Sequence, residues 1–311
     1  MSVVNRAPVD IVVPFFGSDA GLHSLAARLA GLSVTPSDSL TIVDNRPGPG
    51  RSNRALEGVR VIPAPERQSS YFARNVGASV GSASWIVFLD ADVEPAADLV
   101  ERYAEADPAP RTGLLGGTIV DGPPLDGGER SIAARYAILR GSMAQGNTLG
   151  EGPWAYVQTA NCAVRREAFE QIGGFRDNVR SGGDADFGFR LRAAGWSIEP
   201  CYGAHVVHRS RPSVRRMLAQ RARHGSGAAW LDRVHPGSFP PARWSGLIVF
   251  AVRGWITAAR ELAAGRRDQA LLAYMEPLSA WAFELGRAIP NEWDRPATGV
   301  LARSLERILL G

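Results

Sequence analysis

The 311-residue sequence contains no lysine, so all 35 of its basic residues are arginines. Arginine makes two-pronged contacts to phosphate, although a GC-rich coding bias would give the same composition without a functional cause. The two cysteines, Cys162 and Cys201, are too few for a disulfide framework, and we expect both to be reduced. The net charge of only +4 disfavours nucleic acid as a partner and fits a small anionic substrate or an anionic membrane surface.

Long apolar segments are also missing. The most apolar stretch, residues 246–259, is interrupted by Arg253 and is shorter than a membrane span of about 20 residues. The first ten residues contain no apolar core of a secretion signal. We therefore predict a cytoplasmic protein, and the arginine- and tryptophan-rich C-terminal third permits association with the inner face of the membrane.

Strand and helix signals alternate over the first 90 residues. Mostly apolar runs at residues 9–15, 40–43, 59–62 and 85–89 predict strands, and the first and last are typical of strands buried on both faces. Leucines at helical spacing follow the first run, and a serine pair that can cap a helix precedes the fourth. This order predicts an α/β fold with a Rossmann-like, mostly parallel sheet flanked by helices.

Strand signals end after about residue 211. Helical periodicity continues over residues 213–231, 243–264, 268–288 and 297–310. We place a boundary between a catalytic domain, residues 1–210, and a helical C-terminal region, residues 211–311. The roles open to the second region are contact with an acceptor, formation of a homodimer and contact with a membrane surface.

Two of the predicted strands end in carboxylates. One strand ends at Asp44 and the other is followed by the pair Asp90 and Asp92. Ligands of open α/β sheets gather at the carboxyl ends of the strands, where an Asp-x-Asp pair offers the oxygen ligands that Mg²⁺ and Mn²⁺ prefer. The alternative is a turn whose aspartates cap the following helix.

Six segments stand in a fixed order between residues 9 and 210: Val13–Phe16, Ile42–Asn45, Ala73–Ala78, Phe88–Asp92, Thr159–Phe175 and Gly183–Gly195. In order and spacing they resemble the family-2 inverting glycosyltransferases of GT-A fold. The resemblance implies a metal-dependent, non-processive enzyme. It would move a sugar from a nucleoside diphosphate sugar, a UDP-sugar by default, to an acceptor hydroxyl with inversion at the anomeric carbon.

The donor side of the site follows from this resemblance. The family's donor-binding positions correspond here to Pro14, Phe15, Asp44, Arg74, Asn75 and Asp90. The first three would line the base and the ribose, and the next two would face the donor. Asp90 would contact the ribose or metal-bound water. For Arg74 the alternative is an ordinary charge on a helix surface.

The metal and the base are implied in the same way. Asp92 would bind Mn²⁺ or Mg²⁺ directly, and a later histidine, His208 in preference to His205, would complete the metal shell. Asp184 matches the catalytic aspartate that deprotonates the acceptor hydroxyl as it attacks the anomeric carbon. The metal would take up charge on the departing diphosphate. A helix N-cap is the alternative for Asp184.

The acceptor side is implied less firmly. Its positions correspond to Asn161, Cys162, Gly183 and Asp186. Many members of the family carry glutamate where this chain has Gly183, and Asp186 could equally complement the helix dipole. Arg223 lies in a segment similar to the Gln-x-x-Arg-Trp motif of processive synthases, with His224 in place of tryptophan. It would reach the diphosphate or lie on a solvated basic helix.

Two other functions fit parts of the pattern. A sugar-phosphate nucleotidyltransferase shares a related sheet, but it needs a glycine-rich activation loop, of which residues 14–19 are a poor version. A catalytically silent nucleotide-sugar-binding protein would not need the acids at positions 90, 92 and 184. The predicted partners are a nucleotide-sugar donor and an unidentified acceptor: a natural product, a peptide, a lipid carrier or a glycan.

Overall fold

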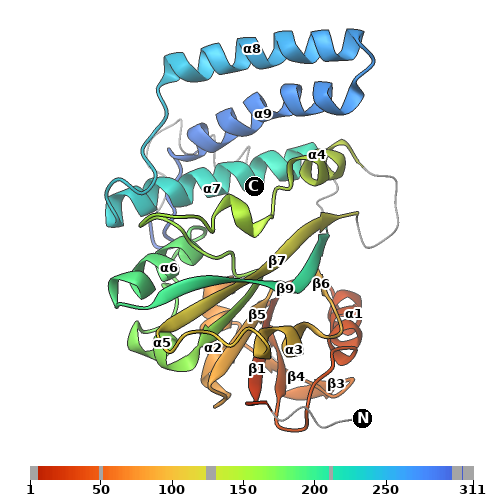
Figure 1. Cartoon of the computed structure of the whole chain (residues 1–311), viewed down its shortest axis with the longest axis vertical. Coiled ribbons are helices and arrows are strands. Elements are labelled where there is room, and N and C mark those ends of the chain that lie inside the picture. Colours follow the sequence, from red (N-terminus) through yellow and green to blue (C-terminus); the bar gives the residue numbers. More distant parts are fainter. Residues whose placement is uncertain (1–5, 49–51, 124–130, 210–212, 296–302, 304–311) are drawn as a thin grey trace. The chain divides into compact units, whose positions relative to one another are not determined.

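The computed structural model describes residues 6–48, 52–123, 131–209, 213–295 and residue 303. The chain divides into two compact units, whose elements are labelled in Figure 1. The first unit contains residues up to 120, 143–177 and 183–208, and the second contains 121–142, 178–182 and the chain from 209 onward. The helix predicted over residues 297–310 lies outside the described residues, apart from Arg303, which is helical.

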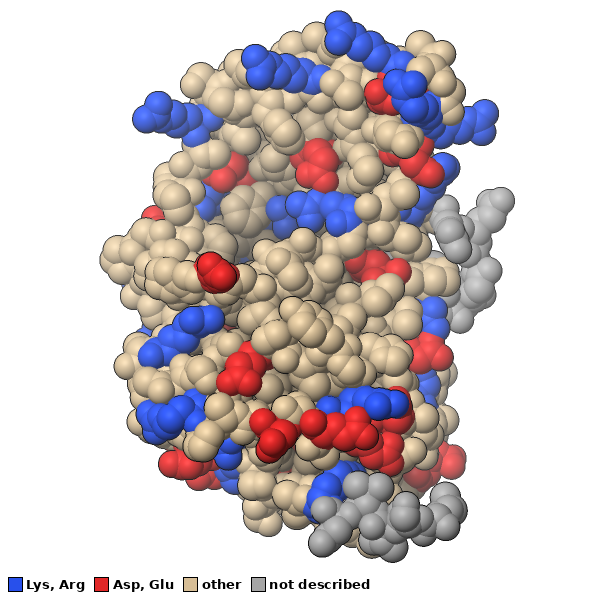
Figure 2. All heavy atoms as spheres, viewed as in Figure 1, with Lys and Arg blue, Asp and Glu red and all other residues tan. Residues whose placement is uncertain are grey.

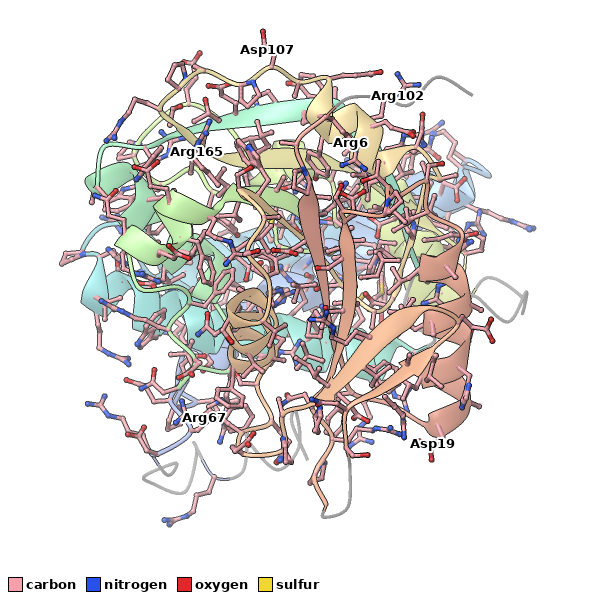
Figure 3. The ribbon with its side chains drawn as sticks, turned by 90° about the horizontal axis from the view of Figure 1, so that it is seen from below. Arg6, Asp19, Arg67, Arg102, Asp107 and Arg165 are labelled. Carbon is pink, nitrogen blue, oxygen red and sulfur yellow. The ribbon has the colours of Figure 1, made fainter. Side chains whose placement is uncertain are left out.

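Charges of both signs are interspersed on the surface. On the face in Figure 2, arginines lie next to aspartates and glutamates, and neither sign forms a large continuous patch among the coloured residues. Arg6 donates to both oxygens of Asp38, and Arg102 pairs with Asp98 and Glu105; both arginines are labelled in Figure 3. Pairing of this kind reduces the single-sign field that would attract a large polyanion.

The first unit is built on a nine-stranded sheet. Its strands are β1 (Val9–Phe15), β2 (Ser39–Asp44), β3 (Arg54–Leu56), β4 (Val59–Pro63), β5 (Trp85–Leu89), β6 (Val93–Pro95), β7 (Thr112–Gly122), β8 (Asn161–Arg165) and β9 (Ser197–Arg209). They lie in the order β3-β4-β2-β1-β5-β8-β7-β9-β6. The strands β4, β2, β1 and β5 pair in parallel, whereas β3, β8 and β7 join the sheet antiparallel. The sheet is therefore parallel where the strands and helices alternate and mixed as a whole.

Helices cover both faces of this sheet. They are α1 (Asp19–Ala30), α2 (Ser70–Ser79), α3 (Leu99–Ala104), α5 (Arg166–Gln171) and α6 (Gly183–Ala193). Helix α1 shares a hydrophobic core with Ile11 and Val13 of β1. Helix α2 packs on the opposite face, where a Cβ added to Gly77 would lie 2.3 Å from Cγ1 of Val12. The predicted layering of helices around the sheet is confirmed.

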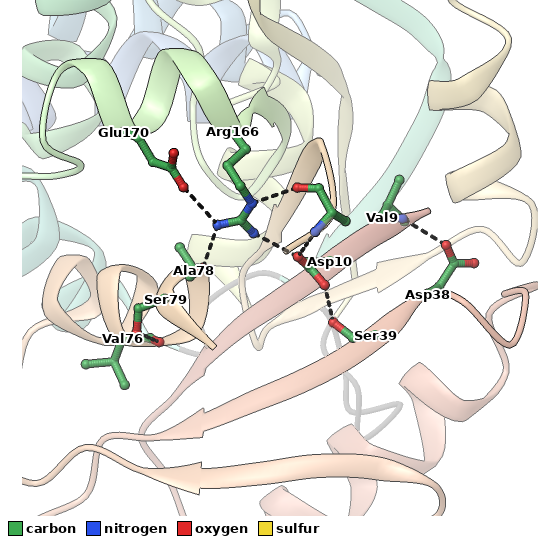
Figure 4. A network of polar contacts seen from close by, with 10 residues as sticks. Val9, Asp10, Asp38, Ser39, Val76, Ala78, Ser79, Arg166 and Glu170 are labelled. Atoms are coloured by element: carbon green, nitrogen blue, oxygen red, sulfur yellow. Dashed lines mark hydrogen bonds and ion pairs between the residues drawn. The ribbon is translucent and has the colours of Figure 1, made fainter. Parts of the chain in front are cut away.

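A buried ion pair holds the first unit together at the edge where β1 begins (Figure 4). Asp10 accepts hydrogen bonds from Nη2 of Arg166 and from the backbone N–H of Ala83, both at 2.8 Å, and from the Ser39 hydroxyl. Arg166 also donates to the carbonyl oxygens of Ala78 and Ala83. Asp10 and Arg166 thus bond to each other and to the surrounding protein. This gives Arg166 a structural role at the end of the sheet where β1 begins, away from Asp44 and Asp90 at the carboxyl ends of β2 and β5.

The second unit is helical. Its helices are α4 (Ile132–Arg140), α7 (Val214–Val234), α8 (Trp244–Ala263) and α9 (Arg267–Gly286), with α9 packed against both α7 and α8. Two glycines let α7 and α9 approach closely, because a Cβ on Gly225 would lie 1.8 Å from the Phe283 carbonyl oxygen and one on Gly286 would meet the Ala222 backbone. None of the helices in the described ranges combines the length and the apolarity that a membrane span requires.

Candidate active site

Acidic residues gather where the parallel strands end. Asp44 ends β2, and Asp90 follows directly after β5. The chain then turns, with the N–H of Val93 3.4 Å from the carbonyl oxygen of Asp90, and enters β6. The next helix, α3, begins only at Leu99, so Asp90 and Asp92 do not cap it. The helix-cap alternative for this pair is wrong, and both carboxylates lie at the ligand-binding edge of the sheet.

Strand β9 brings a histidine to Asp92. His208 pairs with Val93 of β6 in the antiparallel register, and its Nε2 lies 3.6 Å from Oδ2 of Asp92. His208 is buried. His205 lies three residues earlier on the opposite face of the strand, where it is exposed and has its Nδ1 3.3 Å from the Gly203 carbonyl oxygen. Because side chains alternate along a strand, the structure places His208, and not His205, beside the acidic pair.

Arg74 of α2 lies beside the same group of acidic residues. Only 2% of this residue is exposed, so the alternative of a charge on a helix surface is wrong. Its Nη2 donates to Asp90, and its guanidinium carbon lies 5.9 Å from the ring centre of Tyr71 and 6.0 Å from that of Phe175. Its Nε has no hydrogen-bond partner among the described residues.

The electrostatic surroundings of Asp90 join four segments of the chain. Burial raises the pKa of Asp90, and the positive charge of Arg74 opposes that rise. The carboxylates of Asp92 and Asp184 raise the pKa of Asp90 further, and His208 lowers it. The structure therefore brings five predicted site residues into one electrostatic cluster, although they come from α2, the turn after β5, α6 and β9.

Asp184 lies in the first turn of α6 and is held by groups outside that helix. Its Oδ2 accepts hydrogen bonds from the backbone N–H and the hydroxyl of Thr159, at 3.2 and 3.3 Å. The hydroxyl of Tyr71 also bonds to this carboxylate, and it accepts the N–H of Gly183 at 3.0 Å. Burial raises the pKa of Tyr71 well above its usual value, so its hydroxyl stays protonated and donates to Asp184.

Tyr71 explains why the chain has glycine at position 183. A Cβ added to Gly183 would lie 2.6 Å from two ring carbons of Tyr71, so no larger residue fits there while the ring keeps its place. No motif in the sequence points to Tyr71. The only indirect signal for Tyr71 is Gly183 itself, because a glycine where many family members have glutamate leaves the space that the Tyr71 ring fills.

An aromatic cluster fixes α6 on the sheet. Phe187, one turn beyond Asp184, is buried and stacks on Phe175 with 4.3 Å between ring centres. Phe175 also contacts Phe88 of β5 at 5.4 Å and Phe169 of α5 at 5.9 Å. Burial of these rings stabilises α6 in one position, which in turn sets the position of Asp184.

Two predicted ligand-facing residues bond to the protein itself. The side-chain amide of Asn75 donates to the Phe175 carbonyl oxygen at 2.8 Å and accepts the Phe175 N–H at 2.9 Å. Asp186 is fully buried and pairs with Arg190 at 2.8 Å and with Arg176 at 3.4 Å. These bonds fix α2 and α6, while direct contacts of Asn75 with the donor and of Asp186 with the acceptor stay predictions.

Asn161 and Cys162 are enclosed within the sheet at the start of β8. Asn161 accepts a hydrogen bond from the Tyr103 hydroxyl at 2.7 Å and donates to the carbonyl oxygens of Thr118 and Ala204, both at 3.0 Å. Burial raises the pKa of the Cys162 thiol far above its usual value, so the thiol stays protonated. Contact of either residue with an acceptor stays a prediction.

A second ion pair covers the predicted nucleotide side. Nε and Nη2 of Arg46 each lie 2.7 Å from an oxygen of Asp44, and Nη1 lies 2.8 Å from Asp19, labelled in Figure 3. The guanidinium also lies 5.3 Å from the Phe15 ring centre, and Pro14 beside it is half-buried. Any base or ribose contact of Asp44 must therefore be made together with Arg46 or in its place, a feature that no motif reveals.

Arg223, the remaining predicted donor-binding residue, lies in α7 of the second unit and is half-buried. Its neighbour Arg221 has its guanidinium 5.1 Å from the ring centre of Phe283 and so helps to join α7 to α9. A contact of Arg223 with the donor diphosphate stays a prediction.

The metal-binding groups at the site are few. Within the described ranges, no three histidine, cysteine, aspartate or glutamate side chains gather around one point. Asp92 and His208 together offer one oxygen and one nitrogen donor, a mixed set that fits Mn²⁺ better than Mg²⁺. A metal held by this pair would need its remaining ligands from the diphosphate of the donor and from water.

Comparison with known proteins agrees with this geometry. The model of the glycosyl transferase family group 2 matches residues 85–283, which include Asp90, Asp92, Asp184 and His208. The chain belongs to the glycosyl transferase family group 2. This match confirms the predicted family.

Relatives of this chain come from bacteria and archaea. The pre-mycofactocin glycosyltransferase of Mycobacterium tuberculosis is 28% identical over 274 residues, 86% of this chain. The chain spans 56% of that relative, about half its length. Glycosyltransferase AglE of Haloferax volcanii is 25% identical over 73% of this chain and 75% of its own.

A solved structure shows the same fold. The mannosyltransferase PcManGT from Pyrobaculum calidifontis, in complex with GDP-Man and Mn2+, superposes with a TM-score of 0.58 and 17% sequence identity. The match covers 94% of this chain and 89% of that one. The predicted GT-A fold class is confirmed.

Proposed function

We propose that this glycosyltransferase transfers a sugar from a nucleoside diphosphate sugar to an acceptor hydroxyl, with inversion and with a divalent metal. The observation that carries the proposal is the cluster around Asp90. Arg74, Asp92, Asp184 and His208 all act on that one carboxyl group, so a cation site, a metal-binding pair and an oriented base lie within electrostatic reach of one another. Inverting transfer needs these three functions together.

Asp92 and His208 are the residues that would hold the metal. Bound there, Mn²⁺ or Mg²⁺ supplies Lewis-acid stabilisation of the negative charge that develops on the departing diphosphate. Arg74 adds a positive charge on the protein side, since it is buried and paired with Asp90. Asp90, which pairs with Arg74, would contact the ribose or a metal-bound water.

Asp184 acts as the base in this proposal. Its carboxylate takes the proton of the acceptor hydroxyl while the acceptor oxygen bonds to the anomeric carbon and the bond from that carbon to the diphosphate breaks. Three donors, two from Thr159 and one from Tyr71, fix the orientation of the carboxylate. Because the carboxylate is already held in one orientation, the entropy cost of orienting it does not add to the reaction barrier.

The donor and the acceptor remain broad classes. UDP-sugars are the default donors, although the structurally similar PcManGT was solved with GDP-Man. Arg46, which is bonded to Asp44, would lie where the nucleotide base and ribose bind. One relative is named for pre-mycofactocin, and another is an N-acetylglucosaminyl-diphospho-decaprenol L-rhamnosyltransferase. We infer an acceptor that is a natural product, a peptide, a lipid carrier or a glycan. The reaction would take place in the cytoplasm, and the second unit would carry any contact with the membrane or with a second copy.

A donor screen with product analysis tests this function. The protein is melted with UDP-, GDP- and dTDP-sugars in the presence of Mn²⁺, since a ligand that binds only the folded form raises the melting temperature. The stabilising donor is then incubated with candidate acceptors, and NMR identifies the anomeric configuration of the product. We expect the inverted configuration. A retained configuration, or stabilisation by no nucleotide sugar, would contradict the proposal.

A further inference from the structure

Helix α8 is apolar on both of its sides. Leu247, Ala251 and Ala258 are buried, and α8 packs against α9. The remaining large apolar side chains of α8 are between 42% and 63% exposed: Trp244, Ile248, Val249, Phe250, Val252, Trp255, Ile256 and Leu262. We call these eight side chains the α8 face. An exposed apolar surface of this extent on a folded protein marks a site of interaction.

The spacing of these residues makes the face continuous. At 100° per residue, Val249 and Ile256 lie on the side of the helix away from Ala251 and Ala258, and Val252 and Ile248 continue this apolar line around the helix. Trp244 and Trp255 flank this line on the side nearer α9, where the Trp244 ring lies 5.6 Å from that of Trp281. The 20 residues of α8 therefore present an apolar stripe about 30 Å long to the outside of the second unit.

Positive charge lines one side of the α8 face. Arg253 and Arg260 lie four residues after Val249 and Ile256, on the same side of the helix, and both are exposed. Neither forms an ion pair with a residue in the described part of the chain. Glu261, the acid within α8, is already paired with Arg266. Figure 2 shows blue side chains along the outer edge of the α8–α9 hairpin.

We propose that the α8 face docks on the surface of an anionic lipid bilayer. The apolar side chains would enter the boundary between headgroups and acyl chains, and Arg253 and Arg260 would meet the lipid phosphates. Exposed tryptophans suit that depth, because the indole has an apolar body and a polar N–H. The docking does not depend on the transfer chemistry, since it uses no residue of the active site.

A second copy of the chain is a poorer occupant of this face. A twofold contact places the same surface on both partners. Arg253 and Arg260 of one copy would then approach the same arginines of the other, without an unpaired acid on the face to compensate them. Anionic lipid supplies the missing negative charge.

Vesicle sedimentation tests the proposal with the full chain. We expect the protein to sediment with phosphatidylcholine vesicles that contain phosphatidylglycerol, to bind less at high salt, and to bind vesicles of phosphatidylcholine alone weakly. One basic residue at an anionic surface strengthens binding about fivefold, so the double substitution Arg253→Gln/Arg260→Gln should weaken it about 30-fold. Ile248→Ser/Val252→Ser/Ile256→Ser should also weaken binding, by removing the apolar contribution.

Matched controls come from the first unit. Arg54→Gln/Arg60→Gln removes the same charge from exposed strand positions, and Val34→Ser/Val80→Ser removes exposed apolar side chains; both should bind vesicles like the original protein. Melting temperatures show which variants are folded. The proposal is overturned if the original protein ignores anionic vesicles or if the α8 variants bind them equally well. It is also overturned if the α8 substitutions separate a dimer that never binds vesicles.

Discussion

The proposed chemistry of the site depends on a few side chains whose positions are set by their neighbours. Arg74 is buried against Asp90, and Asp184 is fixed by Thr159 and Tyr71. Each of these contacts joins residues distant in the chain, so changing one side chain alters the surroundings of several others. Substitutions at this scale separate the roles of metal binding, donor binding and proton transfer.

Removing the Tyr71 hydroxyl tests whether it positions the base. Tyr71→Phe keeps the ring that packs against Gly183 but loses the hydrogen bond to Asp184, and a hydrogen bond to a charged group is worth about 1.5–3 kcal/mol. We expect kcat to fall about 10- to 100-fold with little change in the KM for the donor. Tyr136→Phe, which removes a buried hydroxyl bonded to Glu276 in the second unit, is the control and should keep its kcat. Equal kcat values for the two variants would contradict the role of Tyr71.

The two histidines of β9 form a matched pair for the metal site. His208→Ala removes the imidazole beside Asp92, so we expect the Mn²⁺ concentration needed for half-maximal activity to rise by at least about tenfold. His205→Ala removes an exposed ring on the other face of the same strand and should leave that concentration unchanged. Metal titrations of activity measure both. If His205→Ala had the larger effect, the assignment of His208 would be wrong.

Among the elements of the first unit, α2 packs closely against the sheet. Gly77 lets the backbone of α2 lie close to Val12 and Val43, and this approach places Arg74 next to Asp90. The aromatic cluster around Phe175 and Phe187 does the same for α6. The positions of the proposed site residues Arg74 and Asp184 are thus set by how near each helix comes to the strands.

Adding a methyl group at this contact should destabilise the first unit. In Gly77→Ala the new Cβ would lie 2.3 Å from the Val12 side chain and 2.9 Å from that of Val43, so one of these groups must move. We expect a loss of about 1–3 kcal/mol in the free energy of unfolding, measured with urea. Gly146→Ala, whose Cβ would meet no atom within 4 Å, should change it by no more than about 0.5 kcal/mol. A stable Gly77→Ala protein would contradict the packing.

Sequence patterns predicted the elements well because strands and helices depend on local periodicity. The runs at 9–15 and 85–89 are β1 and β5, and the acids at their edge follow from the parallel topology. The alternation of buried and exposed side chains along β9 also predicts that His208 and His205 lie on opposite faces of that strand. Arg46 and Tyr71 could not have been found in this way, since their roles arise from contacts between segments that only the fold brings together.

Taken as a whole molecule, the chain is expected to gain stability when donor and metal bind together. A ligand present at about 100 times its Kd adds about 2.7 kcal/mol to the free energy of unfolding, provided that it binds only the folded state. We therefore expect a higher melting temperature with donor and Mn²⁺ together than with either alone, and loss of the difference when EDTA removes the metal. The Asp92→Ala protein should show no such difference. Full stabilisation in EDTA would mean that the metal has no part in donor binding.

The central claim is that Asp184 acts in proton transfer and not in holding the donor. Asp184→Asn preserves the shape of the side chain and its place beside Thr159 while removing the charge that accepts a proton. The decisive measurement is made on this single variant, with donor affinity from calorimetry in Mn²⁺ and turnover with the same donor. We expect an affinity within about threefold of the original protein and turnover reduced by at least about 100-fold. Unchanged turnover in Asp184→Asn would contradict the account.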